Sequence, residues 1–280
     1  MTARILPTGP YPPPGHYLRH LRLGVEVTQE HQVIGSMPVL PDLCDEAGSI
    51  RVGPIATLVD YTTGSIASAA AAPDWVVTHD LKVHLIRVAA KGILTARGSL
   101  VRQARNHFVI ESDIMDEQGQ RVAYSWVTFT RLLGSGDKRP RRAGVPGTRT
   151  LAEEDEVDRV PIDRFLGFGV EAADDILRFE HTPVLRNSTG AIQGGAIATA
   201  FDSLTVAMTT QRLGSPSRTL DLHLYYLNQA RQGPFEARGE VLRASHGTLA
   251  VKLDLVEVGR EVRVLASGSA TGGPAIPYTP

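Results

Sequence analysis

The chain has 280 residues, of which 42% are hydrophobic and 21% charged, and its formal net charge is −1. This length and composition suit two folded domains and exclude a disordered chain, while the near-neutral charge argues against bulk electrostatic binding to nucleic acid or to an anionic membrane. The single cysteine, Cys44, excludes an internal disulfide framework and a cysteine-based metal cluster.

The N-terminal residues carry no apolar stretch typical of a secretory signal, and no apolar run reaches membrane-spanning length. A soluble cytoplasmic protein without a membrane partner is therefore expected. Residues 1–15 are rich in proline and glycine, which predicts a loose arm. Residues 16–23 predict a short amphipathic helix.

From residue 24 onward the chain contains two copies of one pattern. Short sequences recur in the same order at a nearly constant offset: Gly24-Val25-Glu26 as Gly169-Val170-Glu171, Ile55-Ala56-Thr57 as Ile197-Ala198-Thr199, and Ala96-Arg97-Gly98 as Ala237-Arg238-Gly239. The period is far longer than the roughly 20–50 residues of a solenoid repeat. The pattern predicts two similar domains, at residues 16–133 and 161–273.

Each copy predicts the same order of elements, an α+β unit in which one long helix precedes a meander of strands. A short strand (25–27; 170–172) leads through a loop to an apolar helix (55–71; 196–213), which should be buried on most sides. Four strands follow in each copy: 75–88, 93–101, 108–115 and 121–131, then 218–227, 235–242, 248–258 and 261–270. The polar, proline-bearing residues 134–160 are expected to be a linker that acts as a spacer.

The two helices each carry a carboxylate among apolar residues, Asp60 and Asp202. Burying a carboxylate is costly unless it is paired or used, so both are candidates for a general base or a nucleophile. Gly194 and Gly195 open the second helix, where backbone N–H groups could stabilise a developing oxyanion. The alternative for each aspartate is a hydrogen-bonded residue inside a helix.

These residues resemble the helix-entry signature of hotdog-fold acyl-CoA thioesterases, in particular the PaaI-like group. That signature is an amide residue, a His-Gly-Gly six positions later, and an acidic residue nine positions after the histidine. The two copies match it with Asn187, Gln193-Gly194-Gly195 and Asp202, and with Asp45, Arg51-Val52-Gly53 and Asp60. Neither copy has the histidine, and the first copy also lacks the amide and the first glycine.

The resemblance implies two hotdog domains that pack as an intramolecular pseudo-dimer with their sheets joined edge to edge. In the resembled family each active site lies between two domains. In this chain Asp60 would therefore face Asn187, Gln193 and Gly194. Asp202 would face Asp45, Arg51 and Val52. Because a second carboxylate would repel developing negative charge, we expect one competent site, built on Asp60. The family commonly forms tetramers of single units, which implies a homodimer of this chain.

Arginines at strand ends are candidates to bind the phosphates of CoA, since guanidinium binds phosphate well. The resemblance places the phosphates near Arg102 and Arg105 in the first copy and near Arg243, His246 and Gly247 in the second. A solvated strand end without a ligand is an equal alternative.

Two classes of function follow. The first is an acyl-CoA thioesterase that needs no cofactor, because CoA is part of the substrate. The alternative is a non-catalytic acyl-CoA-binding hotdog protein, in which the missing histidine marks lost chemistry. No histidine spacing predicts a metal site, and no Asp/His pair at hydratase spacing favours a hotdog hydratase.

Overall fold

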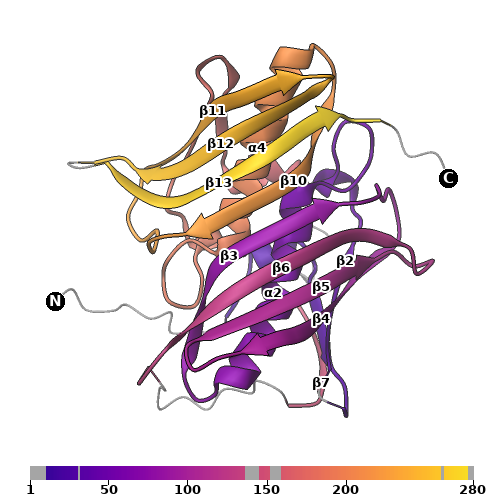
Figure 1. The fold of residues 1–280 in the computed structure, drawn as a ribbon, viewed down its shortest axis with the longest axis vertical. Helices are drawn as coiled ribbons and strands as arrows, with labels where there is room; N and C mark the ends of the chain where they lie inside the picture. The colour runs from indigo at the N-terminus through magenta and orange to yellow at the C-terminus, as the bar shows by residue number, and fades with distance from the viewer. Residues whose placement is uncertain (1–10, 31, 136–144, 152–158, 260–261, 277–280) are drawn as a thin grey trace.

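The two sequence copies form the two halves of one antiparallel sheet (Figure 1). The computed structural model describes residues 11–30, 32–135, 145–151, 159–259 and 262–276. The N-terminal half contains α1 (Tyr17–His20), β1 (Gly24–Val27), β2 (Val33–Pro38), η1 (Pro41–Leu43), α2 (Val52–Ala71), β3 (Trp75–Leu85), β4 (Ile93–Gln103), β5 (His107–Met115) and β6 (Arg121–Leu132). The connection contains β7 (Gly147–Thr150) and α3 (Ile162–Leu166). The C-terminal half contains β8 (Gly169–Glu171), η2 (Ala172–Asp174), β9 (Ile176–Phe179), η3 (Pro183–Leu185), α4 (Gly194–Leu213), β10 (Ser217–Tyr226), β11 (Phe235–Ser245), β12 (Thr248–Glu257) and β13 (Arg263–Pro274).

The sheet order is β7-β1-β2-β4-β5-β6-β3-β10-β13-β12-β11-β9-β8. The halves meet where β3 pairs antiparallel with β10, with Val83 opposite Leu222 and Leu81 opposite Leu224. In each half the sheet curves around one long helix (Figure 1). The expected α+β architecture, two hotdog units packed as a pseudo-dimer with joined sheets, is confirmed.

The long helices have clear end signals. Pro54 lies in the first turn of α2, where its missing N–H costs nothing, and Pro73 follows the last turn. In α4 the side chain of Gln193 accepts a hydrogen bond from the N–H of Ala196, and Gly214 ends the helix in the left-handed conformation. Both helices begin two or three residues before the predicted starts, because proline and glycine are tolerated in a first turn.

α2 and α4 pack closely against each other at their N-terminal ends. A Cβ on Gly53 would lie 2.7 Å from Cα of Thr199, and one on Gly195 would lie 2.3 Å from Oγ1 of Thr57. The buried hydroxyl of Tyr17, in α1, is 2.7 Å from the hydroxyls of both threonines. The short N-terminal helix therefore ties the two halves together where the N-terminal ends of α2 and α4 meet.

The sequence reading missed three strands. β2 and β9 lie in segments that the sequence predicts to be loops, since β2 contains glycine, serine and proline and β9 has only four residues. β7 lies in the predicted linker and pairs with β1, so residues 147–150 are an edge of the sheet rather than a spacer. The basic residues 138–142 and acidic residues 153–156 of the linker lie outside the described residues. No helix in the described part of the chain is long and apolar enough to cross a membrane.

Candidate active site

A cavity of about 940 Å³ lies at the junction of the two halves. The N-terminal half contributes residues of β1, β2 and β3 and one face of α2, which includes Asp60. The C-terminal half contributes residues 187–194, which lead into α4, and Tyr226 with the loop after it. Neither half could form this cavity alone.

Asp60 faces the other half across this cavity. Its Oδ1 accepts a hydrogen bond of 2.7 Å from Thr78, and its Oδ2 accepts one of 3.3 Å from Nε2 of Gln193. Burial raises the pKa of Asp60 from 3.8 to about 6, although the bond from Thr78 opposes the shift. Among the described residues that line the cavity, Asp60 is the one carboxylate, which makes it the group best suited to accept a proton near neutral pH.

The first turn of α4 lies directly opposite this carboxylate. A Cβ on Gly194 would be 3.1 Å from Oδ2 of Asp60, and the Tyr226 hydroxyl donates a 2.9 Å hydrogen bond to the carbonyl of Gly194. In the described part of the chain, no hydrogen-bond acceptor contacts the N–H of Gly194 or of Gly195. Gly194 lines the cavity, whereas Gly195 is buried against Thr57. The first turn of α4 thus brings to the cavity wall the positive end of the helix dipole and an N–H that has no acceptor among the described residues.

Asn187 also lines the cavity, but its side-chain oxygen is used within its own loop. Oδ1 accepts hydrogen bonds from the N–H groups of Thr189 and Ala191 and from the Thr189 hydroxyl. Asp45 occupies the same position in the first copy and accepts from the N–H groups of Ala47 and Ser49. The amide of Asn187 therefore shapes the loop, and its Nδ2 group alone is left to contact a ligand.

The corresponding position at Asp202 is filled by protein. Nε and Nη2 of Arg51 both lie 3.0 Å from Oδ2 of Asp202, and Arg51 also contacts Asp163 and Ser203. Asp202 is fully buried and lines neither of the two cavities. Burial raises its pKa, with Arg51 opposing the shift. This arrangement suits a buried ion pair, and leaves no space for a substrate beside the carboxylate.

The predicted phosphate-binding residues lie away from the cavity. Arg102 lies near the end of β4 and Arg105 in the turn that follows. Arg243 lies near the end of β11, and His246 and Gly247 lie in the β11–β12 turn. All five are exposed, and none lines either of the two cavities. His246 and Gly247 both have positive φ, so the tight turn itself accounts for this pair. Their role as phosphate ligands stays a prediction.

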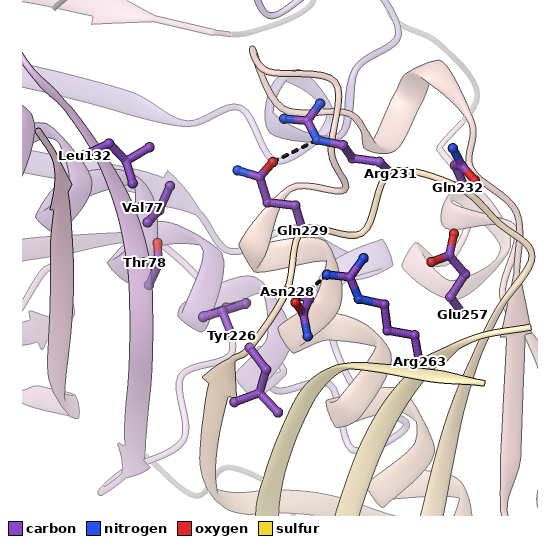
Figure 2. A pocket seen from close by; sticks show the side chains of 11 residues that line it. Val77, Thr78, Leu132, Tyr226, Asn228, Gln229, Arg231, Gln232, Glu257 and Arg263 are labelled. Carbon is purple, nitrogen blue, oxygen red and sulfur yellow. Dashed lines mark hydrogen bonds between the residues drawn. The ribbon is translucent and has the colours of Figure 1, made fainter. Parts of the chain in front are cut away.

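A second cavity, of about 600 Å³, opens beside the first and shares Thr78 and Tyr226 with it. Figure 2 shows Arg231 and Arg263 on the C-terminal half, across from Val77 and Thr78. Arg231 donates to Gln229 and to the carbonyl of Thr189, and Arg263 donates to Asn228. Neither arginine forms an ion pair among the described residues. No motif in the sequence marked them, because they lie in a loop and at a strand start that only folding brings together.

Replacing Gly194 with alanine is expected to lower the activity of the site without unfolding the protein. The new methyl group would press on Oδ2 of Asp60 and on the Tyr226 hydroxyl, at 3.1 and 3.2 Å. A displacement of this kind can reduce kcat by about 10²-fold. Steady-state kinetics beside a thermal melt would measure this. Alanine at Gly259, where an added Cβ would meet nothing within 4 Å, is the matched control, and equal losses in the two variants would contradict a specific role for Gly194.

A family profile matches both copies of the chain. The Thioesterase superfamily profile matches residues 47–123 and 189–262, which together contain both long helices and most of the strands after them. A search of curated proteins finds no match.

Solved structures share the whole fold at low sequence identity. A thioesterase candidate from Thermobifida fusca is 14% identical over 93% of this chain and 98% of its own, with a TM-score of 0.61. The 12:0-ACP thioesterase of Umbellularia californica is 9% identical over 86% and 96%, with a TM-score of 0.57. An acyl-ACP thioesterase of Bacteroides thetaiotaomicron is 11% identical over 85% and 97%, with a TM-score of 0.56. With a profile that matches more than half of its residues and a double-hotdog fold, this chain belongs to the thioesterase superfamily.

Proposed function

We propose that the protein is an acyl-CoA thioesterase that works at one site, built on Asp60. The observation that carries this proposal is the approach of the Asp60 carboxylate to the first turn of α4, where a Cβ on Gly194 would lie 3.1 Å from Oδ2. A base and an oxyanion donor thus face each other across a cavity. These are the two groups that acyl transfer to water requires.

The reaction begins when Asp60 accepts a proton from a water molecule in the cavity. The hydroxide so formed attacks the thioester carbonyl carbon, and the carbonyl oxygen becomes negative. The N–H of Gly194 donates to this oxygen, aided by the positive end of the α4 dipole. The tetrahedral intermediate then expels the thiolate, which takes the proton from Asp60, and the products are a carboxylic acid and a free thiol.

Asp60 could also attack the carbonyl carbon directly and form an anhydride, which water then hydrolyses. A single turnover in H₂¹⁸O distinguishes the base from a nucleophile whose anhydride is hydrolysed at the Asp60 carbonyl. If Asp60 is the nucleophile and water attacks the anhydride at the Asp60 carbonyl, ¹⁸O enters the Asp60 side chain. If Asp60 is the base, ¹⁸O enters only the released acid.

The positions of Arg231 and Arg263 favour a substrate whose thiol carrier bears phosphate groups. They lie at the cavity that adjoins Asp60, and both contact only neutral partners in the described part of the chain. Guanidinium groups bind phosphate oxygens through charge-assisted hydrogen bonds. Glu257 lines the same cavity and adds one negative charge. We propose that the phosphates of CoA bind here, in place of the exposed turns that the sequence suggested.

A panel of acyl-CoA thioesters with a thiol-release assay tests the function. The expected result is turnover of at least one member, with an Arg231→Ala variant raising KM for every substrate. Parallel reactions with the same acyl groups on acyl carrier protein test the carrier, since two solved structures with this fold are named as acyl-ACP thioesterases. Tight binding without any turnover would favour the non-catalytic acyl-CoA-binding alternative.

Activity is expected to fall on the acid side of pH 6. Asp60 must be ionised to accept a proton, and burial raises its pKa to about 6. Hence kcat/KM should decrease about tenfold for each pH unit below 6 and reach a plateau above it. A pH–rate profile from 4.5 to 8 measures this. A rate that rises in proportion to hydroxide across the whole range would contradict a base of this pKa.

A further inference from the structure

Among the described residues that line the cavity there is one cation, Arg149, on the connecting strand β7. Arg149 pairs with Val25 of β1, and directly opposed residues of paired strands lie on the same face of a sheet. Val25 and Arg149 both line the cavity. The guanidinium is therefore on the cavity side of β7, at the part of the wall that is open to solvent.

Arg149 contacts a neutral group, and no carboxylate pairs with it in the described part of the chain. Nη2 donates a 2.6 Å hydrogen bond to the carbonyl of Tyr11, and Arg149 makes no ion pair with any residue that the structure describes. The side chains of Tyr11 and Tyr61 line the same cavity. Burial raises the pKa of both tyrosines, while Arg149 opposes the shift, so their hydroxyls remain neutral donors.

The wall between Asp60 and this polar end is largely apolar. Leu18, Val25, Val27, Val33 and Phe129 line it. On α2 the lining residues run from Asp60 through Gly64 to Ser68, which is ~12 Å of helix at 1.5 Å per residue. With C–C bonds of about 1.5 Å, an extended chain of about ten carbon atoms matches the length of this row of lining residues.

We propose that Arg149 binds an anionic group at the far end of the acyl chain, so that the preferred substrates are monothioesters of dicarboxylic acids. This inference rests on the proposed function, because it concerns the acyl end of the same site. A carboxylate matches guanidinium geometry, and the tyrosine hydroxyls add two donors. Without Arg149, an anion here would meet only the repulsion of Asp60.

The test compares pairs of substrates of equal chain length: adipyl-CoA with hexanoyl-CoA, and suberyl-CoA with octanoyl-CoA. The wild-type protein is expected to show kcat/KM at least tenfold higher for one of the dicarboxylic members. Arg149→Ala should remove that preference and change the hexanoyl and octanoyl values less than threefold. Arg149→Lys should retain part of it, since it keeps the charge. Tyr61→Phe, which keeps the ring, serves if Arg149→Ala does not fold, and should lower the preference.

Two kinetic outcomes would overturn the inference. Equal or faster turnover of the neutral substrates would show that the inner end does not select an anion. An equal loss of kcat/KM for both substrate types in Arg149→Ala would mean that Arg149 binds the carrier phosphates. That equal loss is the result we expect for the control variant Arg231→Ala.

Absence of any turnover would defeat the proposed function, and binding then decides the inference. Calorimetry with wild-type protein and with Asp60→Asn would compare adipyl-CoA and hexanoyl-CoA. Binding of adipyl-CoA at least tenfold tighter would support the anion site. Equal affinities would refute it.

Discussion

Asp60→Asn is expected to lower kcat by about 10²–10⁴-fold, because the amide cannot accept the proton that the reaction releases. The fold should persist, since asparagine has the same shape and can keep a contact to Thr78 and Gln193. The measurement is thiol release under saturating substrate, with a thermal melt of the same preparation.

The stability of Asp60→Asn provides an independent check. Burial raises the pKa of Asp60, so ionising this group in the folded state costs stability. That cost develops as the pH rises from about 4 to about 6 and persists above. The variant should therefore melt with the wild type near pH 4 and at an equal or higher temperature at pH 7. An inactive variant that melts well below the wild type at pH 7 would show damage to the fold instead of loss of a base.

Asp202→Asn is expected to have the opposite effect, with lower stability and little change in kcat per folded molecule. The substitution leaves the guanidinium of Arg51 buried without the carboxylate that lies 3.0 Å away. Breaking a buried ion pair by changing one partner costs about 3–5 kcal/mol, and the remaining contact of Arg51 with Asp163 should keep the loss near the lower end.

Chemical denaturation and kinetics on the same variant separate the two aspartates. Asp60→Asn and Asp202→Asn are matched, since each changes one carboxylate at the equivalent position of a long helix. A large loss of kcat in Asp202→Asn with unchanged stability would show that the second site works. Equal kinetic losses in both variants would mean two active sites.

Much of the fold could be predicted because the main elements show a local periodicity of apolar residues, and because the same pattern occurs in two copies. The apolar runs that became α2 and α4 and the alternating runs that became β3 to β6 each carry their own periodicity. The short strands β2, β7 and β9 lack such a pattern, and they are strands because a neighbour pairs with them. Pairing with a neighbour is a tertiary property, so a linear reading took these segments as loop or linker.

The candidate site divides in the same way. The spacing between the helix-entry residues and the aspartate marked Gly194 and Asp202 in one copy and Asp60 in the other. The resemblance implied that each aspartate faces the helix entry of the other copy. Arg231, Arg263 and Arg149 carry no such signal, because they meet the cavity from loops and strand ends distant in sequence. Self-association of the chain stays a prediction.

The sequence by itself determined the two-copy architecture, the two buried helices and the pair of helix carboxylates, since these depend on periodicity and on residue type. The sequence favoured Asp60 over Asp202 on account of Asp45, but only the tertiary structure decided what surrounds each carboxylate. Asp60 meets an amide, a helix N-terminus and an open cavity, whereas Asp202 meets a buried guanidinium that fills the equivalent space. The physical reason is that each carboxylate takes its surroundings from the other copy, so its pKa and its access to substrate depend on contacts between residues more than a hundred positions apart.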